Sequence, residues 1–129
     1  MRRLLTTLLI LSLAAPIAGC GGDDDGGSGP AATFGAGQPV KVVAKDYSFD
    51  PDNIVIEGGG KVTIELKNDG ALAHNLRVEK DGSEVGGTPT FQGGETKSGD
   101  VTLEPGEYEM ICSVGDHADR GMKGTLTVK

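Results

Sequence analysis

The sequence contains little cysteine, little histidine and no excess of positive charge. Its 129 residues include two cysteines, two histidines, 12 lysines and arginines and 19 acidic residues, giving a formal net charge of −7. This acidic balance argues against binding to nucleic acid, and against electrostatic adhesion to an anionic lipid surface. No stretch carries a sustained helical pattern of apolar residues, so the sequence gives no support to a helical fold.

The N-terminal segment, residues 1–19, resembles the signal peptide of a bacterial lipoprotein. A short basic stretch precedes the apolar run from Leu4 to Ala15, which is too short to span a bilayer, since spanning needs about 20 apolar residues. The tetrapeptide Ile17-Ala18-Gly19-Cys20 resembles a lipobox, in which Cys20 is acylated and becomes the new N-terminus. A plainly secreted protein is the alternative, because an ordinary signal peptide also ends in small residues.

Residues 20–38 are small, polar and rich in glycine and aspartate, and they are predicted to form a flexible tether after the lipidated cysteine. The remaining residues, 39–129, form one predicted domain of about 90 residues, which is enough for a single modest core. Removing Arg2 and Arg3 leaves 10 basic against 19 acidic residues, a net charge of −9 for the mature chain. Attachment to a membrane would therefore come from acyl chains.

Short segments with alternating apolar residues, separated by turn residues, predict strands in this domain. The predicted strands are Val40–Asp46, Asn53–Glu57, Lys61–Asn68, His74–Glu79, Lys97–Leu103, Glu107–Ser113 and Gly124–Lys129. About seven to eight strands with regular turns predict an all-β fold, an antiparallel Greek-key β-sandwich. Residues 81–95 are rich in glycine and threonine and are predicted to be irregular.

The few histidine and sulfur side chains gather in a pattern that predicts a metal site. If Cys20 is lipidated, Cys112 is the only thiol left in an oxidising compartment, and a bound metal would protect it. Cys112, His117 and Met122 follow at regular spacing on one predicted hairpin, and His74 begins another strand. Two imidazoles and a thiolate with a weak axial thioether are the ligand set of blue copper. The sequence therefore predicts one copper ion held by His74, Cys112, His117 and Met122.

Each of these residues also has an ordinary interpretation. A lone histidine is usually a solvated surface group, a buried cysteine acts as a small hydrophobe, and methionine fills cores. Met110 has this ordinary role by prediction, because it shares a strand face with Tyr108 two residues away. Zinc accepts histidine and cysteine, but methionine is a poor zinc ligand. A Cys–His nucleophilic pair at Cys112 and His117 would need an orienting group and a substrate cleft, which the sequence does not indicate.

Several motifs resemble those of the cupredoxin family, which includes plastocyanin and azurin. They are Asp46 to Pro51, Ile56 to Gly59, Ala73-His74-Asn75, Pro105 to Tyr108, Cys112 to His117, and Gly121 to Val128. The resemblance implies that Asn75 ties the two ligand loops together, that His117 is exposed and serves as the electron port, and that residues 71–73 belong to a docking surface. The family often has a proline between the cysteine and the histidine, whereas residues 113–116 contain none. That departure concerns the rigidity of the loop and its docking partner.

The resemblance implies a carrier of single electrons and no enzymatic activity. Multicopper oxidases and copper nitrite reductases need more histidines than this chain has, and a dinuclear copper site needs two cysteines in the ligand loop. Two alternatives remain: a copper chaperone or scavenger of the same fold, and a metal-free adhesion-type sandwich. Expected partners are unidentified redox proteins, with the chain a monomer that is exported and lipid-anchored on the outer face of the cell membrane or on the periplasmic side.

Overall fold

The structure is a computed structural model that describes residues 29–129, all of which form strands and connecting loops. The predicted signal peptide and residues 20–28 of the predicted tether lie outside the described residues. The strands are β1 (Ala32–Gly35), β2 (Val40–Lys45), β3 (Ser48–Asp50), β4 (Asn53–Glu57), β5 (Gly60–Asn68), β6 (Arg77–Lys80), β7 (Ser83–Gly87), β8 (Thr96–Leu103), β9 (Gly106–Ile111) and β10 (Lys123–Val128).

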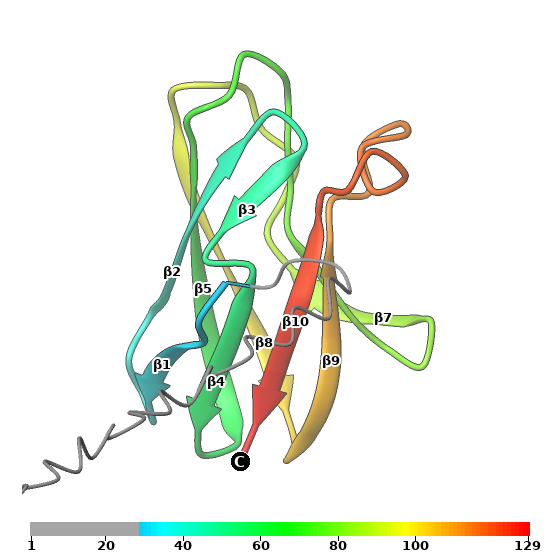
Figure 1. Ribbon diagram of the computed structural model, residues 1–129. Helices are drawn as coiled ribbons and strands as arrows, with labels where there is room; N and C mark the ends of the chain where they lie inside the picture. The colour runs from blue at the N-terminus through cyan, green and yellow to red at the C-terminus, as the bar shows by residue number, and fades with distance from the viewer. Residues whose placement is uncertain (1–28) are drawn as a thin grey trace, which may run out of the picture.

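The strands form two sheets that face one another (Figure 1). A six-stranded sheet has the order β1-β4-β10-β9-β6-β7, and a four-stranded sheet has the order β3-β2-β5-β8. Because side chains alternate across a strand, one face of each sheet can be apolar. Val62, Ile64 and Leu66 of β5, which the sequence places on one face, are all buried in the core. The core thus lies between the sheets.

The predicted all-β sandwich is confirmed, with one difference in strand direction. The sheets are mixed, because β1 with β4, β4 with β10, and β2 with β5 pair in parallel. The chain crosses from one sheet to the other between these strands, and a crossing strand need not run against its neighbour, as it must in a hairpin. No helix in residues 29–129 is long and apolar enough to cross a membrane.

Two segments that the sequence predicts to be irregular contain strands. β1 lies within the predicted tether, where Phe34 packs against the core, so the ordered domain begins before residue 39. β7 lies within residues 81–95 and pairs with β6 through a two-residue turn. Asp81 and Gly82 in this turn have φ values of 51° and 77°, and left-handed residues of this kind match the twist of a hairpin. The prediction of an irregular excursion is therefore wrong for residues 83–87.

Three connections meet at one end of the sandwich, the upper end in Figure 1. They are the turn between β2 and β3, the loop between β5 and β6, and the loop between β9 and β10. The C-terminus lies at the opposite end. All four predicted metal ligands belong to the last two of these connections.

Candidate metal centre

The loop between β9 and β10 carries three of the predicted ligands. Cys112 follows the last residue of β9, and Met122 precedes the first residue of β10. The Cys112 N–H donates to the Met122 carbonyl at 3.0 Å, and the Met122 N–H donates to the His117 carbonyl at 3.0 Å. These backbone bonds fold the loop back on itself. Three side chains spread over residues 112 to 122 are thereby brought to one place.

His74 reaches the same place from the loop between β5 and β6. Its N–H donates to the Phe91 carbonyl at 3.0 Å, and the Phe91 N–H donates to the His74 carbonyl at 3.0 Å. This isolated antiparallel bridge precedes β6, so the regular strand begins at Arg77 and not at His74 as predicted. His74 is completely buried. Its position is fixed by backbone bonds on both of its peptide groups.

The donor atoms of His74, Cys112 and His117 converge. The two Nδ1 atoms lie 3.2 Å apart, and the Cys112 Sγ lies 3.8 Å from the Nδ1 of His74 and 3.5 Å from that of His117. All three residues are buried, and Cys112 is free of any disulfide. Two imidazole nitrogens and one sulfur thus face a single point that is shielded from water.

These separations suit one shared metal ion. Zinc, as a reference, takes imidazole nitrogen at about 2.0–2.1 Å and thiolate sulfur at about 2.3 Å. At angles of about 100–120° around the ion, such atoms lie roughly 3.1–3.8 Å from one another. The observed separations of 3.2, 3.5 and 3.8 Å match this range. The residues present therefore fit a three-coordinate N₂S site without rearrangement.

Met122 adds a thioether to this site. Its side chain is fully buried, and its backbone is bonded to Cys112 and His117 as described above. Soft thiolate and thioether donors select copper, whereas calcium and magnesium require oxygen ligands. His74, Cys112, His117 and Met122 are positioned as a site for one copper ion.

Asn75 joins the two ligand-bearing loops. Its Nδ2 donates to the Ser113 hydroxyl at 2.8 Å and to the Thr90 hydroxyl at 2.9 Å. Its Oδ1 accepts the backbone N–H of Ser113 at 2.9 Å. Since Asn75 follows His74 and Ser113 follows Cys112, these bonds hold the two ligands next to each other.

Asp46 is a neighbour of the site that the sequence analysis did not identify. It follows β2, and its Oδ1 lies 2.9 Å from the Nε2 of His74. This hydrogen bond, together with one from the backbone N–H of Ala71, lowers the pKa of the Asp46 carboxyl. Asp46 is 28 residues from His74 in sequence, and no pattern connects the two. Only the fold reveals that a carboxylate supports one ligand.

Tyr47 lies against the second histidine. Its ring meets the His117 ring in a T-shaped arrangement with centroids 5.3 Å apart, and the Arg120 guanidinium lies 5.0 Å from the Tyr47 centroid. His117 is only 8% exposed, compared with 0% for His74. The expectation of an exposed His117 is therefore wrong for this structure, although His117 is the ligand nearer to the surface. Arg120, which lies over the Tyr47 ring, belongs to the same loop as His117 and also pairs with Asp116 of that loop.

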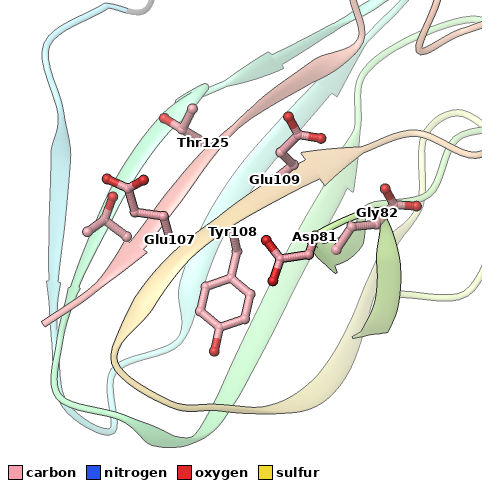
Figure 2. Close-up of a pocket in the computed structure, with 8 residues that line it drawn as sticks. Asp81, Gly82, Glu107, Tyr108, Glu109 and Thr125 are labelled. Atoms are coloured by element: carbon pink, nitrogen blue, oxygen red, sulfur yellow. The ribbon is translucent and has the colours of Figure 1, made fainter.

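One surface groove lies away from the metal centre. It has a volume of about 460 Å³ and contains none of the four ligands. Figure 2 shows Glu107 and Glu109 of β9 and Asp81 of the β6–β7 turn around it. Glu107 and Glu109 alternate with the inward-facing Tyr108, so the groove lies on the outer face of the six-stranded sheet. The candidate chemistry belongs to the buried site at the end of the sandwich.

Comparison with known proteins agrees with this geometry. Residues 8–128 match the family described as the cupredoxin-like domain. Three similar solved structures are an auracyanin of Roseiflexus castenholzii (18% identity, TM-score 0.63, 70% of this chain and 96% of that one), an azurin of Methylomonas sp. strain J (19%, 0.63, 73% and 99%) and auracyanin A of Chloroflexus aurantiacus, a "blue" copper protein (24%, 0.59, 71% and 100%). No curated protein sequence matches the chain.

Proposed function

Because the chain belongs to the cupredoxin-like family, we propose that it is a type 1 (blue) copper protein that carries single electrons between exported or membrane redox partners. One observation supports this most strongly. Three buried donor atoms, from His74, Cys112 and His117, converge at separations that suit one ion. The family match and the blue copper protein among the similar structures support the same conclusion.

The chain's own residues provide what fast electron exchange requires. When bound, copper supplies one-electron exchange between its +1 and +2 states. Those states prefer different geometries, so a fixed set of ligands keeps the rearrangement between them small. The backbone bridge at His74 and the closed loop from Cys112 to Met122 hold the ligands in place. Burial of all four side chains excludes water that would otherwise bind the metal.

Electrons would leave the site on the side of His117. This histidine is the less buried of the two, and Leu72, two residues before His74, is 40% exposed. An exposed leucine between Ala71 and Ala73 would give a redox partner a small apolar contact next to the copper site. The partner would be another exported or membrane redox protein. The carrier itself would be a monomer held near the membrane through an acylated Cys20.

The decisive test is replacement of the thiolate ligand. We expect the purified full-length protein to bind one copper ion and to turn blue on oxidation, through charge transfer from thiolate to copper. Cys112→Ser should lose the colour, because a hydroxyl cannot supply that transition. The matched control is Cys20→Ser, which makes the same change outside the site and should stay blue. Optical and electron paramagnetic spectra, with metal analysis, provide the measurement.

The outcomes separate the competing functions. A wild-type protein that binds no copper would leave only the metal-free sandwich. A protein that binds copper without a blue colour or reversible oxidation would be a chaperone or scavenger. A Cys112→Ser protein that is still blue would show that Cys112 is not the ligand.

A further inference from the structure

We propose that Asp46 is a positioning residue for the copper site. It holds the His74 ring with Nδ1 available to the metal, and it places a negative charge beside the site that lowers the reduction potential. This inference rests on the proposed copper function. It concerns a residue outside the ligand set, reached only through the fold, since Asp46 and His74 lie 28 positions apart.

The contact with Asp46 determines the tautomer of His74. A neutral imidazole carries its proton on one nitrogen and offers a lone pair on the other. An ionised carboxylate only accepts, so the contact of 2.9 Å between Asp46 Oδ1 and His74 Nε2 requires the proton on Nε2. The lone pair is then on Nδ1, the atom that faces Cys112 Sγ and His117 Nδ1. The carboxylate thus prepares the nitrogen that must bind the metal.

Asp46 is itself held by backbone hydrogen bonds. Its two carboxylate oxygens accept the backbone N–H of Ala71 at 3.1 and 3.2 Å, and its Oδ1 accepts that of Leu72 at 3.2 Å. These donors belong to the loop that leads into His74. The carboxylate is therefore oriented by the same segment that carries the ligand. A carboxylate that is hydrogen-bonded in this way to a ligating histidine fixes the ring and raises its basicity toward the metal.

The Asp46–His74 pair needs the space that Gly70 leaves free of a side chain. A Cβ added at Gly70 would lie 2.4 Å from Asp46 Oδ1 and 2.9 Å from His74 Nε2. Both distances are below ordinary contact, so any side chain at position 70 would displace the hydrogen bond. The glycine at position 70 therefore leaves the space that the Asp46–His74 pair needs. This is a second observation for the pair, separate from the hydrogen-bond distance.

The Asp46 carboxylate also places a negative charge beside the copper site. Asp46 forms no ion pair with any lysine or arginine among residues 29–129, so no cation neutralises it directly. A negative charge near the metal stabilises copper(II) more than copper(I), because the oxidised ion carries one more positive charge. The side chain is 36% exposed, so solvent reduces the size of the effect without changing its sign. Asp46 should therefore lower the reduction potential.

The test compares three variants of the full chain. Asp46→Asn keeps the shape and removes the charge, and we expect its reduction potential to rise. Asp46→Ala also removes the hydrogen bond, and we expect a loss of copper affinity of about 10–100-fold. The matched control is Asp100→Asn, because Asp100 on β8 is also an exposed carboxylate; it accepts a hydrogen bond from the Thr63 hydroxyl and pairs with Lys61. Its potential and affinity should equal those of the wild type.

A second readout needs no copper. In the metal-free protein, ¹⁵N NMR of the imidazole should show His74 locked with its proton on Nε2, whereas Asp46→Ala should show a mixture of the two tautomers. Gly70→Ala should reproduce the affinity loss and the altered NMR signature by displacing the pair. A purely structural role would lower the thermal stability of Asp46→Asn and leave its potential unchanged.

The outcomes are distinguishable from failure of the copper function. If the wild type binds copper and is blue, but Asp46→Asn has the wild-type potential and Asp46→Ala has the wild-type tautomer, the role of Asp46 is overturned and the copper function stands. If the wild type binds no copper, the proposed function fails, and with it the role of Asp46 that rests on it.

Discussion

Two methionines of this chain are chemically identical and fully buried, yet they differ in surroundings. Met110 lies on β9 with its side chain in the core between the sheets. Met122 lies at the end of the ligand loop, with backbone bonds to Cys112 and His117. The pair therefore separates the role of an axial ligand from the role of a core side chain.

Replacing Met122 by leucine should keep the blue colour and raise the reduction potential. The thioether is a weak donor that favours copper(II) over copper(I), and leucine removes it while keeping a similar volume. Met110→Leu is the matched control and should leave the potential unchanged. Cyclic voltammetry of both variants gives the measurement. A falling potential in Met122→Leu, or a shift in Met110→Leu, would contradict the axial role of Met122.

At this scale the sequence predicts the ligands better than their support. The spacing of Cys112, His117 and Met122 on one hairpin is visible in the sequence, because a single loop brings them together. The contact of Asp46 with His74 depends instead on the turn at Tyr47, which has a φ of 70°, and on the missing side chain at Gly70, where a Cβ would clash with the pair. No local pattern encodes either feature, since both arise when two distant loops meet.

At the scale of elements, the side-chain amide of Asn75 joins the two loops that carry the ligands. Asn75 is 4% exposed and makes three hydrogen bonds, two of them to Ser113 in the other ligand loop. A buried amide of this kind is costly to remove, because the backbone N–H of Ser113 loses its side-chain partner. The stability of the site end therefore depends on contacts between loops as well as on the sheets.

Asn75→Ala should lower the free energy of unfolding of the metal-free protein by about 1–3 kcal/mol, the cost of leaving buried polar groups unpaired. Urea unfolding followed by circular dichroism gives the measurement. Asn53→Ala is a suitable control, because Asn53 lies on β4 and the hydrogen bonds of its side-chain amide are exposed. Its effect should stay within about 0.5 kcal/mol. Equal losses in the two variants would show that Asn75 does not join the loops as inferred.

Sequence reasoning missed β7 for a physical reason. β7 contains Gly86 and Gly87, and isolated from the fold such residues indicate a loop. In the structure, a Cβ at Gly99 of β8 would lie 1.9 Å from the carbonyl oxygen of Gly87, so the two backbones touch. The glycines therefore allow close approach between strands of different sheets. By contrast, β4 has the predicted bounds, because its alternating apolar residues encode its burial locally.

At the scale of the whole molecule, the acidic charge and the metal site are separate features. The domain from residue 39 onward carries 10 basic and 16 acidic residues, a net charge of −6. Its acidic groove on the outer sheet face is distinct from the ligand loops at the end of the sandwich. Neither feature attracts the protein to an anionic membrane. If the protein is membrane-bound, the attachment must come from elsewhere in the chain or from a partner.

We therefore expect Cys20→Ser to release the protein from membranes into the exported soluble fraction without changing its spectrum. Each buried methylene of an acyl chain contributes about 0.8 kcal/mol, and stable attachment needs more than one chain, which an acylated lipoprotein cysteine provides. Cys112→Ser is the reciprocal control: it should lose the blue colour and stay with the membranes. Cell fractionation with immunoblotting, alongside the optical spectrum, measures both.

A Cys20→Ser protein that still sediments completely with membranes would mean that the apolar run Leu4 to Ala15 is retained as an anchor or that a membrane partner holds the domain. Either result would remove the lipid anchor from the proposed function and leave the copper site intact, because the two lie on separate parts of the chain.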